Sequence, residues 1–260
     1  MKNNLAINDQ QKYIPIVSLI GIIGILIVAI YNSAFKGGRF TCSRYILNSY
    51  LYILLVLVLI MLEVLYLDYE KFNSVNIFKH FSGLWGTIGM LVILVGVLLI
   101  LMKIHPKFVI LKHLVWIIFS LILGILVYPF YQKSKAENTL VGVMFSLISI
   151  LIVFSAVAFI KPEWISLSWG PILCFILLGV IIFSIINRLI NKDNKKYQRP
   201  KWLSYFVIVL FIFFLLYDTK VIQVHAKNCK TETADYINES LGIVLDVLNL
   251  FQNLVMVQGS

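Results

Sequence analysis

Long apolar stretches separated by short polar ones are the main pattern of this 260-residue sequence. A helix needs about 20 apolar residues to cross the hydrocarbon core of a bilayer. Eight stretches come close to that length, and we expect a membrane helix over each of them. They are Tyr13–Asn32, Tyr45–Leu67, Leu84–Met102, Val109–Pro129, Thr139–Ile160, Ser168–Ile190, Trp202–Val224 and Tyr236–Val257. The pattern predicts an all-α, polytopic membrane helix bundle without a separate soluble domain.

The composition agrees with this pattern. Hydrophobic residues make up 60% of the chain, charged residues only 13%, and the mean hydropathy is +0.93. Soluble domains carry about a quarter charged residues, because their helices need a polar face toward water. In lipid, every backbone N–H and C=O must be satisfied within the protein, and long unbroken apolar runs then favour helices over barrel strands. The lipid bilayer is therefore the first expected partner.

The net charge of +10 does not indicate nucleic-acid binding. The Lys and Arg residues lie mostly in short connections, where they are expected to anchor helix ends at lipid headgroups. Aromatic residues at the predicted helix edges are expected at the same interface. These are Tyr45, Tyr66, Trp85, Tyr128, Trp164, Trp169 and Trp202. The three cysteines, Cys42, Cys174 and Cys229, are far apart and lack metal-ligand spacing, so we expect neither a disulfide nor a zinc site.

The distribution of Lys and Arg leaves the membrane orientation open. The N-terminal tail and the even-numbered connections hold 12 of the 22, and the odd-numbered connections hold the other 10. The strongest local signal is the cluster Lys192, Lys195, Lys196, Arg199 and Lys201, which favours a cytosolic position for that connection. The first apolar stretch lacks a clean cleavage site after it, so we expect an uncleaved first helix.

Ionisable residues inside membrane helices are costly and usually mark a pathway, a relay or a binding site. Glu63, Lys103, His105 and Arg188 lie near predicted helix ends, and we expect their side chains to reach the interface. His113 lies just inside its helix and is expected to be a packed interfacial histidine rather than a ligand.

Asp246 lies near the middle of the last predicted helix. Glu239, Gly242, Asp246, Asn249 and Asn253 follow one another at spacings of three and four residues, so they share one helix face. Such a polar face should line the bundle interior or a water-filled cavity. The alternative is a helix–helix interface built from Asn and Gly, which explains the asparagines better than it explains a central carboxylate.

Asp218 is the expected partner of Asp246. The two residues lie at similar depth, roughly 9 and 8 Å from the ends of consecutive antiparallel helices. Two neighbouring carboxylates in low dielectric cannot both ionise cheaply, so the pair is expected to share a proton and to sense pH. When ionised, it offers the oxygen ligands that Ca²⁺ prefers, so both residues are predicted metal ligands. The alternative for Asp218 is an ion pair with Lys220 at the helix end.

The C-terminal third resembles the last two helices of the transmembrane Bax inhibitor motif family. The residues that carry this resemblance are Tyr217–Ile222, Asp235–Ile237 and Leu245–Phe251. Gly124–Pro129, Phe145–Ala158 and the connection Lys161–Gly170 fall where the middle helices of that family would lie. The likeness predicts a seven-helix domain over residues 45–257. It is preceded over residues 1–44 by a tail, an extra membrane helix and a linker.

The resemblance implies seven helices around a central last helix, Ca²⁺ leak across a membrane and suppression of cell death. It also implies that Asp218 and Asp246 form a pH-sensitive gate. The leading hypothesis is therefore a pH-sensitive Ca²⁺ leak channel, or a Ca²⁺ homeostasis protein, that suppresses cell death. Its expected location is the endoplasmic reticulum, the Golgi or another intracellular membrane, or a viral membrane. One alternative is a non-conducting interaction protein that binds cell-death regulators. Another is a structural membrane protein. The chain is rich in Ile, Lys, Asn and Tyr, as is typical of an AT-rich genome, and a virus is one possible source.

The sequence carries no motif that indicates an enzyme. It lacks the metalloprotease, serine-hydrolase and phosphate-binding signatures, so no catalytic residue is expected. No cofactor is expected apart from Ca²⁺ as a bound or transported ion. The sequon Asn238-Glu239-Ser240 falls within the last predicted helix, and we expect it to remain unglycosylated.

Overall fold

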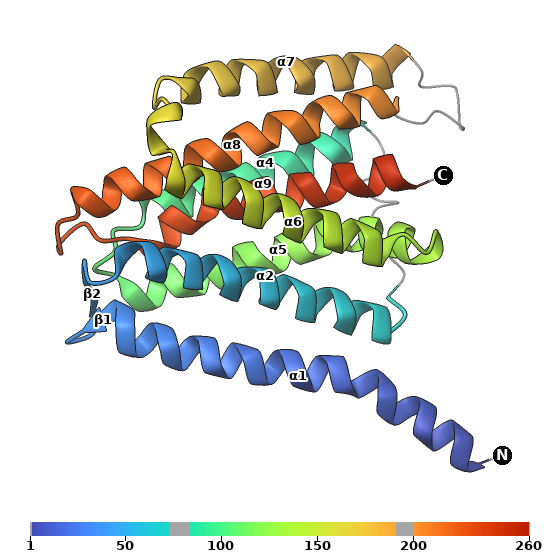
Figure 1. The fold of residues 1–260 in the computed structure, drawn as a ribbon. Helices are drawn as coiled ribbons and strands as arrows, with labels where there is room; N and C mark the ends of the chain where they lie inside the picture. Colours follow the sequence, from blue (N-terminus) through green and yellow to red (C-terminus); the bar gives the residue numbers. More distant parts are fainter. Residues whose placement is uncertain (1, 73–83, 191–199, 260) are drawn as a thin grey trace. The chain divides into compact units, whose positions relative to one another are not determined.

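The computed structural model describes residues 2–72, 84–190 and 200–259, with side chains from Ile14 onward except at 84–88, 90–91 and 188. Most described residues are helical (Figure 1). The helices are α1 (Lys2–Ala34), α2 (Tyr45–Tyr69), α4 (Leu84–Lys103), α5 (Val109–Ala136), α6 (Leu140–Ile160), α7 (Trp169–Ile190), α8 (Lys201–Lys227) and α9 (Tyr236–Gln258). The short elements are β1 (Phe35–Lys36), β2 (Arg39–Phe40) and the 3₁₀ helix η1 (Pro162–Trp164).

All eight predicted helices are present, and most of their ends lie within two or three residues of the expected positions. Among the described residues, seven of them are long and apolar enough to cross a membrane, and only a shorter part of α4 is counted. The expected end of α5 at Pro129 is wrong, because the helix continues to Ala136. Proline removes one backbone hydrogen bond, and membrane helices tolerate that loss where neighbouring groups compensate.

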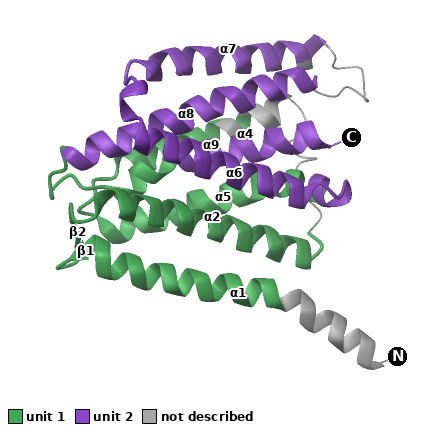
Figure 2. Ribbon diagram, in the orientation of Figure 1, with its two compact units in different colours: residues 1–132, 228–241 green, residues 133–227, 242–260 purple. Residues whose placement is uncertain are grey.

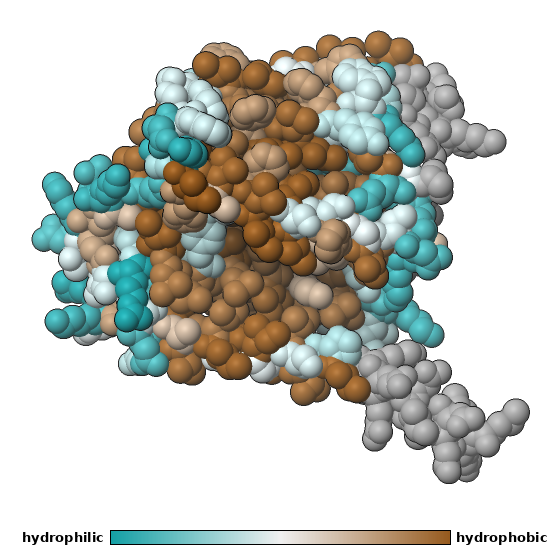
Figure 3. All heavy atoms as spheres, in the orientation of Figure 1, coloured by the Kyte–Doolittle hydropathy of each residue, from teal (hydrophilic) through white to brown (hydrophobic). Residues whose placement is uncertain are grey.

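Large apolar side chains are exposed along the lengths of the helices. Ile25, Val141 and Phe175 are 71%, 82% and 76% exposed, respectively. Figure 3 shows hydrophobic residues along the helices of the face in view, with hydrophilic residues gathered near the helix ends. A soluble protein rarely exposes so much apolar surface, whereas lipid tails cover it without penalty. The structure therefore fits an integral, multi-pass membrane protein.

The chain divides into two compact units (Figure 2). Unit 1 comprises residues 1–132 and 228–241, and unit 2 comprises residues 133–227 and 242–260. The last helix, α9, begins in unit 1 and continues into unit 2. In the most apolar window of α9, 67% of the residues are buried, more than in any other candidate span. The expectation of an all-α bundle with a buried last helix and an extra N-terminal helix is confirmed.

In unit 1, a tight hairpin reverses the chain between α1 and α2. Gly37 and Gly38 have φ angles of +59° and +75°, which a two-residue hairpin turn requires and which glycine adopts without steric cost. The two helices then lie side by side. Ser33 on α1 donates a 2.5 Å hydrogen bond to the side chain of Asn48 on α2, and Asn48 donates back to the Ser33 carbonyl.

An aromatic cluster around Tyr52 forms the packed end of unit 1. Rings of Phe40, His113, Trp116 and Tyr236 all lie within about 6 Å of the Tyr52 ring. His113 Nδ1 lies 2.7 Å from the Val109 carbonyl, which can only accept, so this nitrogen carries the hydrogen. In the neutral ring, Nε2 then accepts from the Tyr52 hydroxyl at 2.8 Å. His113 is therefore a packed histidine, as predicted.

Unit 2 is built around α8, which packs against both α6 and α7. Ala158, Ile165 and Leu216 form a small buried core there. Two polar side chains of α8 hold the end of α6 and the connection that follows it. Gln223 donates to the Ala158 carbonyl and Lys220 donates to the Pro162 carbonyl, each at 2.9 Å. Lys220 thus has a backbone partner, whereas the alternative interpretation of the sequence paired it with Asp218.

The predicted interfacial residues divide into two groups. Tyr66, Trp164, Trp202, Lys103 and His105 are exposed, and their position at the membrane interface stays a prediction. Tyr45 and Tyr128 are buried, and Trp169 packs against Phe213, so the interfacial interpretation was wrong for the first two. The side chains of Trp85 and Arg188, and most of the cluster at 192–201, lie outside the described residues.

Candidate functional site

Asp246 is buried in α9, and its side chain is only 3% exposed. It lies ten residues after the start of the helix, and Val247 and Leu250 beside it are also buried. The short side chain of an aspartate cannot reach the membrane interface from this depth. The structure therefore places an ionisable group in an apolar interior, as the sequence predicted.

Asp218 of α8 reaches Asp246 within unit 2. The two carboxyl groups are close enough to interact electrostatically. Two ionised carboxylates so close together in an apolar interior repel each other, so the arrangement favours a proton on one of them. The structure therefore brings together the two residues that the sequence singled out.

Gly242 makes the close approach of the two carboxyls possible. It lies one helical turn before Asp246, directly beneath the Asp218 side chain. A Cβ atom at this position would lie 2.1 Å from Asp218 Oδ2 and 2.8 Å from its Cγ. Only a residue without a side chain leaves this space to the carboxyl of α8.

One oxygen of the pair is left without a partner. Among the described residues, Asp246 Oδ2 is buried and makes no hydrogen bond. A buried acceptor without a partner costs about 1–3 kcal/mol, so the position favours a proton, a water molecule or a cation. The described residues contain no group of three or more His, Cys, Asp or Glu that could hold a metal ion. Since Ca²⁺ takes six to eight oxygen ligands, the pair suits a transient contact with Ca²⁺ better than a resident site.

The other polar residues of α9 do not bridge helices in the way that the alternative interpretation requires. Asn249 donates to the Leu245 carbonyl and Asn253 donates to the Asn249 carbonyl, both at 2.8 Å and both within α9. Glu239, in the first turn of α9, lies close to the Tyr45 hydroxyl within unit 1. A helix–helix interface made of Asn and Gly therefore accounts for Gly242, but not for the hydrogen bonds that Asn249 and Asn253 make within α9.

Glu63 does not reach the interface, so that expectation was wrong. Its Oε2 atom is buried and has no hydrogen-bond partner among the described residues. The carboxyl lies over Gly124 of α5, where a Cβ atom would be 1.8 Å from Oε2. Glu63 also lines an open apolar cavity of about 340 Å³ between α1, α2 and α5. Nothing along α2 alone indicates this contact, because it depends on a glycine 61 residues away.

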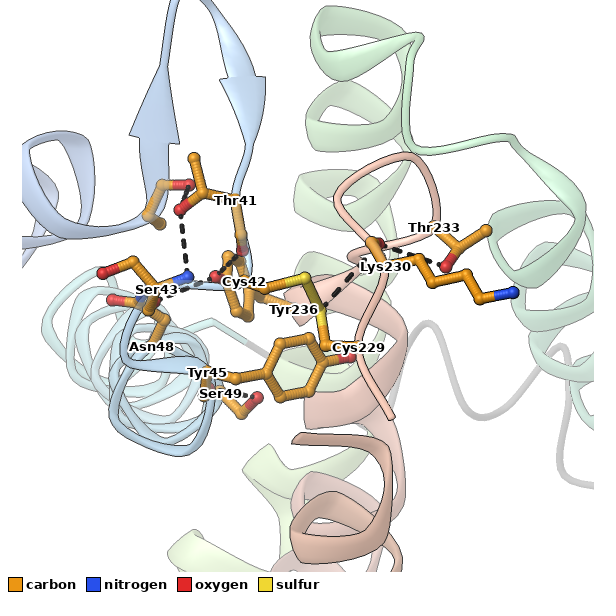
Figure 4. The surroundings of a disulfide bond; sticks show 11 residues. Thr41, Cys42, Ser43, Tyr45, Asn48, Ser49, Cys229, Lys230, Thr233 and Tyr236 are labelled. Atoms are coloured by element: carbon orange, nitrogen blue, oxygen red, sulfur yellow. Dashed lines mark hydrogen bonds between the residues drawn. A yellow bond between two sulfur atoms is a disulfide. The ribbon is translucent and has the colours of Figure 1, made fainter. Parts of the chain in front are cut away.

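The structure contains a disulfide between Cys42 and Cys229, so the expectation of no disulfide was wrong (Figure 4). Their Cα atoms are 5.8 Å apart although 187 positions separate them in the chain. The bond ties the connection before α2 to the connection before α9. Beside it, the Tyr236 hydroxyl donates to the carbonyls of Thr41 and Ser43. The available sequence signal was that both cysteines follow odd-numbered predicted helices, and so belong to one side of the membrane.

A buried ion pair lies nearby in unit 1. Lys112 is fully buried, and its ammonium lies 2.5 Å from Asp235 Oδ2 and 2.8 Å from the Ile104 carbonyl. Asp235 Oδ1 accepts the Asn238 backbone N–H at 3.1 Å and so caps the start of α9. Burial raises the pKa of the Asp235 carboxyl, and the Lys112 ammonium opposes that rise. The sequence had suggested that cations near helix ends lie at the lipid headgroups, and Lys112 is a clear exception.

Comparison with known proteins gives one match. A family model described as "Inhibitor of apoptosis-promoting Bax1" matches residues 42–259, a range that includes α2 through α9 and both aspartates. Neither a curated protein nor a solved structure is significantly similar to the chain. The matched range begins after α1 and covers most of the chain.

Proposed function

Because the chain belongs to the family of inhibitors of apoptosis-promoting Bax1, we propose that it suppresses cell death by leaking Ca²⁺ across its membrane through a pH-sensitive gate. Family membership supports the coarser function, an anti-apoptotic multi-pass membrane protein. The Ca²⁺ leak and the gate, formed by Asp218 and Asp246, are the finer part of the proposal.

The observation that carries the gate is the close approach of two carboxyl groups on consecutive helices, with one of them over Gly242. One member is almost completely buried, and one of its oxygens has no described partner. A proton bound between two carboxyls in low dielectric is held strongly, and its loss or gain changes the local charge by a full unit. Protonation of such a pair would therefore make the contact between α8 and α9 over Gly242 depend on pH.

Three protonation states follow from this geometry. With one proton, a charge-assisted hydrogen bond holds α8 against α9, which we assign to the closed state. Without a proton, the two carboxylates repel each other and expose oxygens that attract Ca²⁺. With two protons, the bond loses its charge assistance and the contact weakens. The leak is therefore expected to pass through a minimum where the pair holds one proton.

The test is Ca²⁺ flux into liposomes at a fixed Ca²⁺ gradient, from about pH 5 to about pH 8. We expect wild type to show a pH-dependent leak, and Asp246→Asn and Asp218→Asn to show a flat profile, since an amide exchanges no proton in this range. Glu232→Gln removes one carboxylate from the exposed α8–α9 connection and serves as the control that retains the wild-type profile.

Two results would contradict the proposal at different levels. An unchanged pH profile in both Asn variants would exclude the carboxyl pair as the gate while leaving the leak intact. No flux from folded, reconstituted wild type would exclude the leak itself. If such a protein still suppressed cell death when expressed in cells, a non-conducting role in binding cell-death regulators would replace it.

A further inference from the structure

The disulfide restricts the membrane topology. Cys42 lies between α1 and α2, and Cys229 lies between α8 and α9, so an S–S bond between them requires both connections on the same side. An even number of crossings must then separate them. Six described α-helices lie between the two cysteines, namely α2, α4, α5, α6, α7 and α8. The stretches 73–83 and 191–199 are too short to add another crossing helix.

This count requires α4 to cross the membrane. Without it, five helices would separate the cysteines, and the two sulfur atoms would lie on opposite sides. The 20-residue length of α4 corresponds to about 30 Å, which is sufficient for a crossing. The disulfide thus supports an eighth crossing helix that hydropathy over the described residues counts only in part.

Hydrogen bonds of unit 1 group the same connections independently of the disulfide. Lys112 binds both the Ile104 carbonyl, after α4, and Asp235, before α9. Asn238 donates to the Met102 carbonyl at 3.2 Å, and Tyr236 donates to the Thr41 carbonyl. The connections 35–44, 104–108 and 228–235 therefore lie at one membrane face, and each pair of them is separated by an even number of helices.

We infer that this face lies on the oxidising side of the membrane, a lumen or the cell exterior. Disulfides form and persist in oxidising compartments, whereas cytosolic thiols are kept reduced. Both cysteines are only half-buried and adjoin the exposed residues Ser43 and Lys230, so the bond is accessible to the surrounding redox buffer. The start of α1, the connection at 137–139 and the end of α9 then face the cytosol.

The charge of the α7–α8 connection supports the same orientation. Residues 192–201 contain four lysines and one arginine, and connections rich in Lys and Arg are retained in the cytosol. Over the whole chain, the numbers of Lys and Arg on the two sides differ by only two, which does not favour either orientation. The disulfide and the strongest local charge signal now give one orientation.

The first experiment asks whether the bond exists in cells. Full-length protein is denatured and treated with a maleimide that carries a large polymer, before and after reduction, and the adducts are counted on a gel. We expect one adduct before reduction, at Cys174, which is the free cysteine of the structure, and three after it. Three adducts before reduction would overturn the inference.

The second experiment locates the two faces while the disulfide stays intact. In a Cys174→Ser background, single cysteines are introduced as Asn194→Cys or as Lys107→Cys, a residue exposed between α4 and α5. Sealed microsomes, which present their cytosolic face, are treated with a membrane-impermeant maleimide. We expect Asn194→Cys to react at once and Lys107→Cys to react only after detergent opens the vesicles. The reverse pattern, or reaction of both from one side, would overturn the orientation.

Discussion

At the scale of single residues, Gly242 controls how closely the carboxyl of Asp218 approaches α9. The space above its Cα atom is filled by the Asp218 carboxyl, so any side chain at position 242 competes directly with that group. The contact between Asp218 and Asp246 therefore depends on a residue that carries no functional group. This dependence can be tested without removing either carboxylate.

We predict that Gly242→Ala displaces the Asp218 carboxyl and reduces the pH dependence of the Ca²⁺ leak. The added methyl group should cost about 1–3 kcal/mol of stability, the usual range for overpacking a well-packed site. Liposome flux and thermal unfolding in detergent measure the two effects. Gly179→Ala on α7, where a Cβ atom meets nothing within 4 Å, should change neither. A wild-type pH profile in Gly242→Ala would contradict this role.

The surroundings of Asp246 could be predicted from the sequence, whereas those of the Glu63 carboxyl could not. Asp246 could be predicted because its depth follows from its position near the middle of one apolar helix. Glu63 lies six residues before the end of α2, and position alone suggested a route to the interface. Its burial is set by Gly124 on another helix. Periodicity predicts which face a residue occupies, but not which helix covers that face.

At the scale of elements, the start of α9 is fixed by Asp235. This residue caps the helix through one carboxyl oxygen and binds Lys112 through the other. Lys112 in turn holds the Ile104 carbonyl after α4. The first turn of α9 is therefore positioned by a cap, an ion pair and a backbone contact that share two side chains.

We predict that Lys112→Met destabilises the protein by about 3–5 kcal/mol, because it leaves the Asp235 charge buried without its partner. Loss of the ammonium should raise the pKa of Asp235 further. A carboxyl group whose pKa is higher in the folded than in the unfolded protein favours folding at low pH and opposes it at high pH. The destabilisation should therefore be largest at high pH and shrink as the pH falls. Thermal unfolding in detergent at several pH values measures this.

The double variant provides the internal check of that prediction. Asp235→Asn removes the charge but keeps a side-chain oxygen that can cap α9. Lys112→Met/Asp235→Asn should therefore recover much of the stability that Lys112→Met loses. Lys201→Met, at an exposed helix end, should have little effect. Strict additivity of the two buried substitutions would contradict a coupled pair.

Most elements could be predicted from apolar run length alone. The exceptions have physical reasons. The length of the apolar run suggested that α5 ends at Pro129, but the helix continues to Ala136. The hydrogen bond that proline removes does not end a helix that packs against neighbouring helices. The β1–β2 hairpin was not predicted, since its strands have only two residues each, although Gly37-Gly38 is a recognised turn signal.

At the scale of the whole molecule, the disulfide closes the longest described covalent loop. We predict that Cys42→Ser, Cys229→Ser and the double variant each lose the same stability, about 2–4 kcal/mol, because each removes one and the same bond. Thermal unfolding without reductant measures the loss. Reductant should bring wild type to the level of the variants, and Cys174→Ser should behave as wild type. A double variant twice as destabilised as either single would exclude a shared bond.

The membrane class, the family and the Asp218–Asp246 pair could be predicted because they rest on composition, local motifs and consecutive helices. The disulfide, the Lys112–Asp235 pair and the Glu63–Gly124 contact join residues from 61 to 187 positions apart. No local spacing connects such residues. Their pairing is determined only when the intervening helices have taken their places.

The same separation has a consequence for biosynthesis. At about 5–20 residues per second, a ribosome needs roughly 10–40 s to make the 187 residues that follow Cys42 up to Cys229. Cys42 waits throughout as a thiol in an oxidising compartment. It meets its partner only if the six helices between them have crossed the membrane an even number of times. The finished bond is thus a chemical record of insertion, absent from any molecule in which a single helix failed to cross.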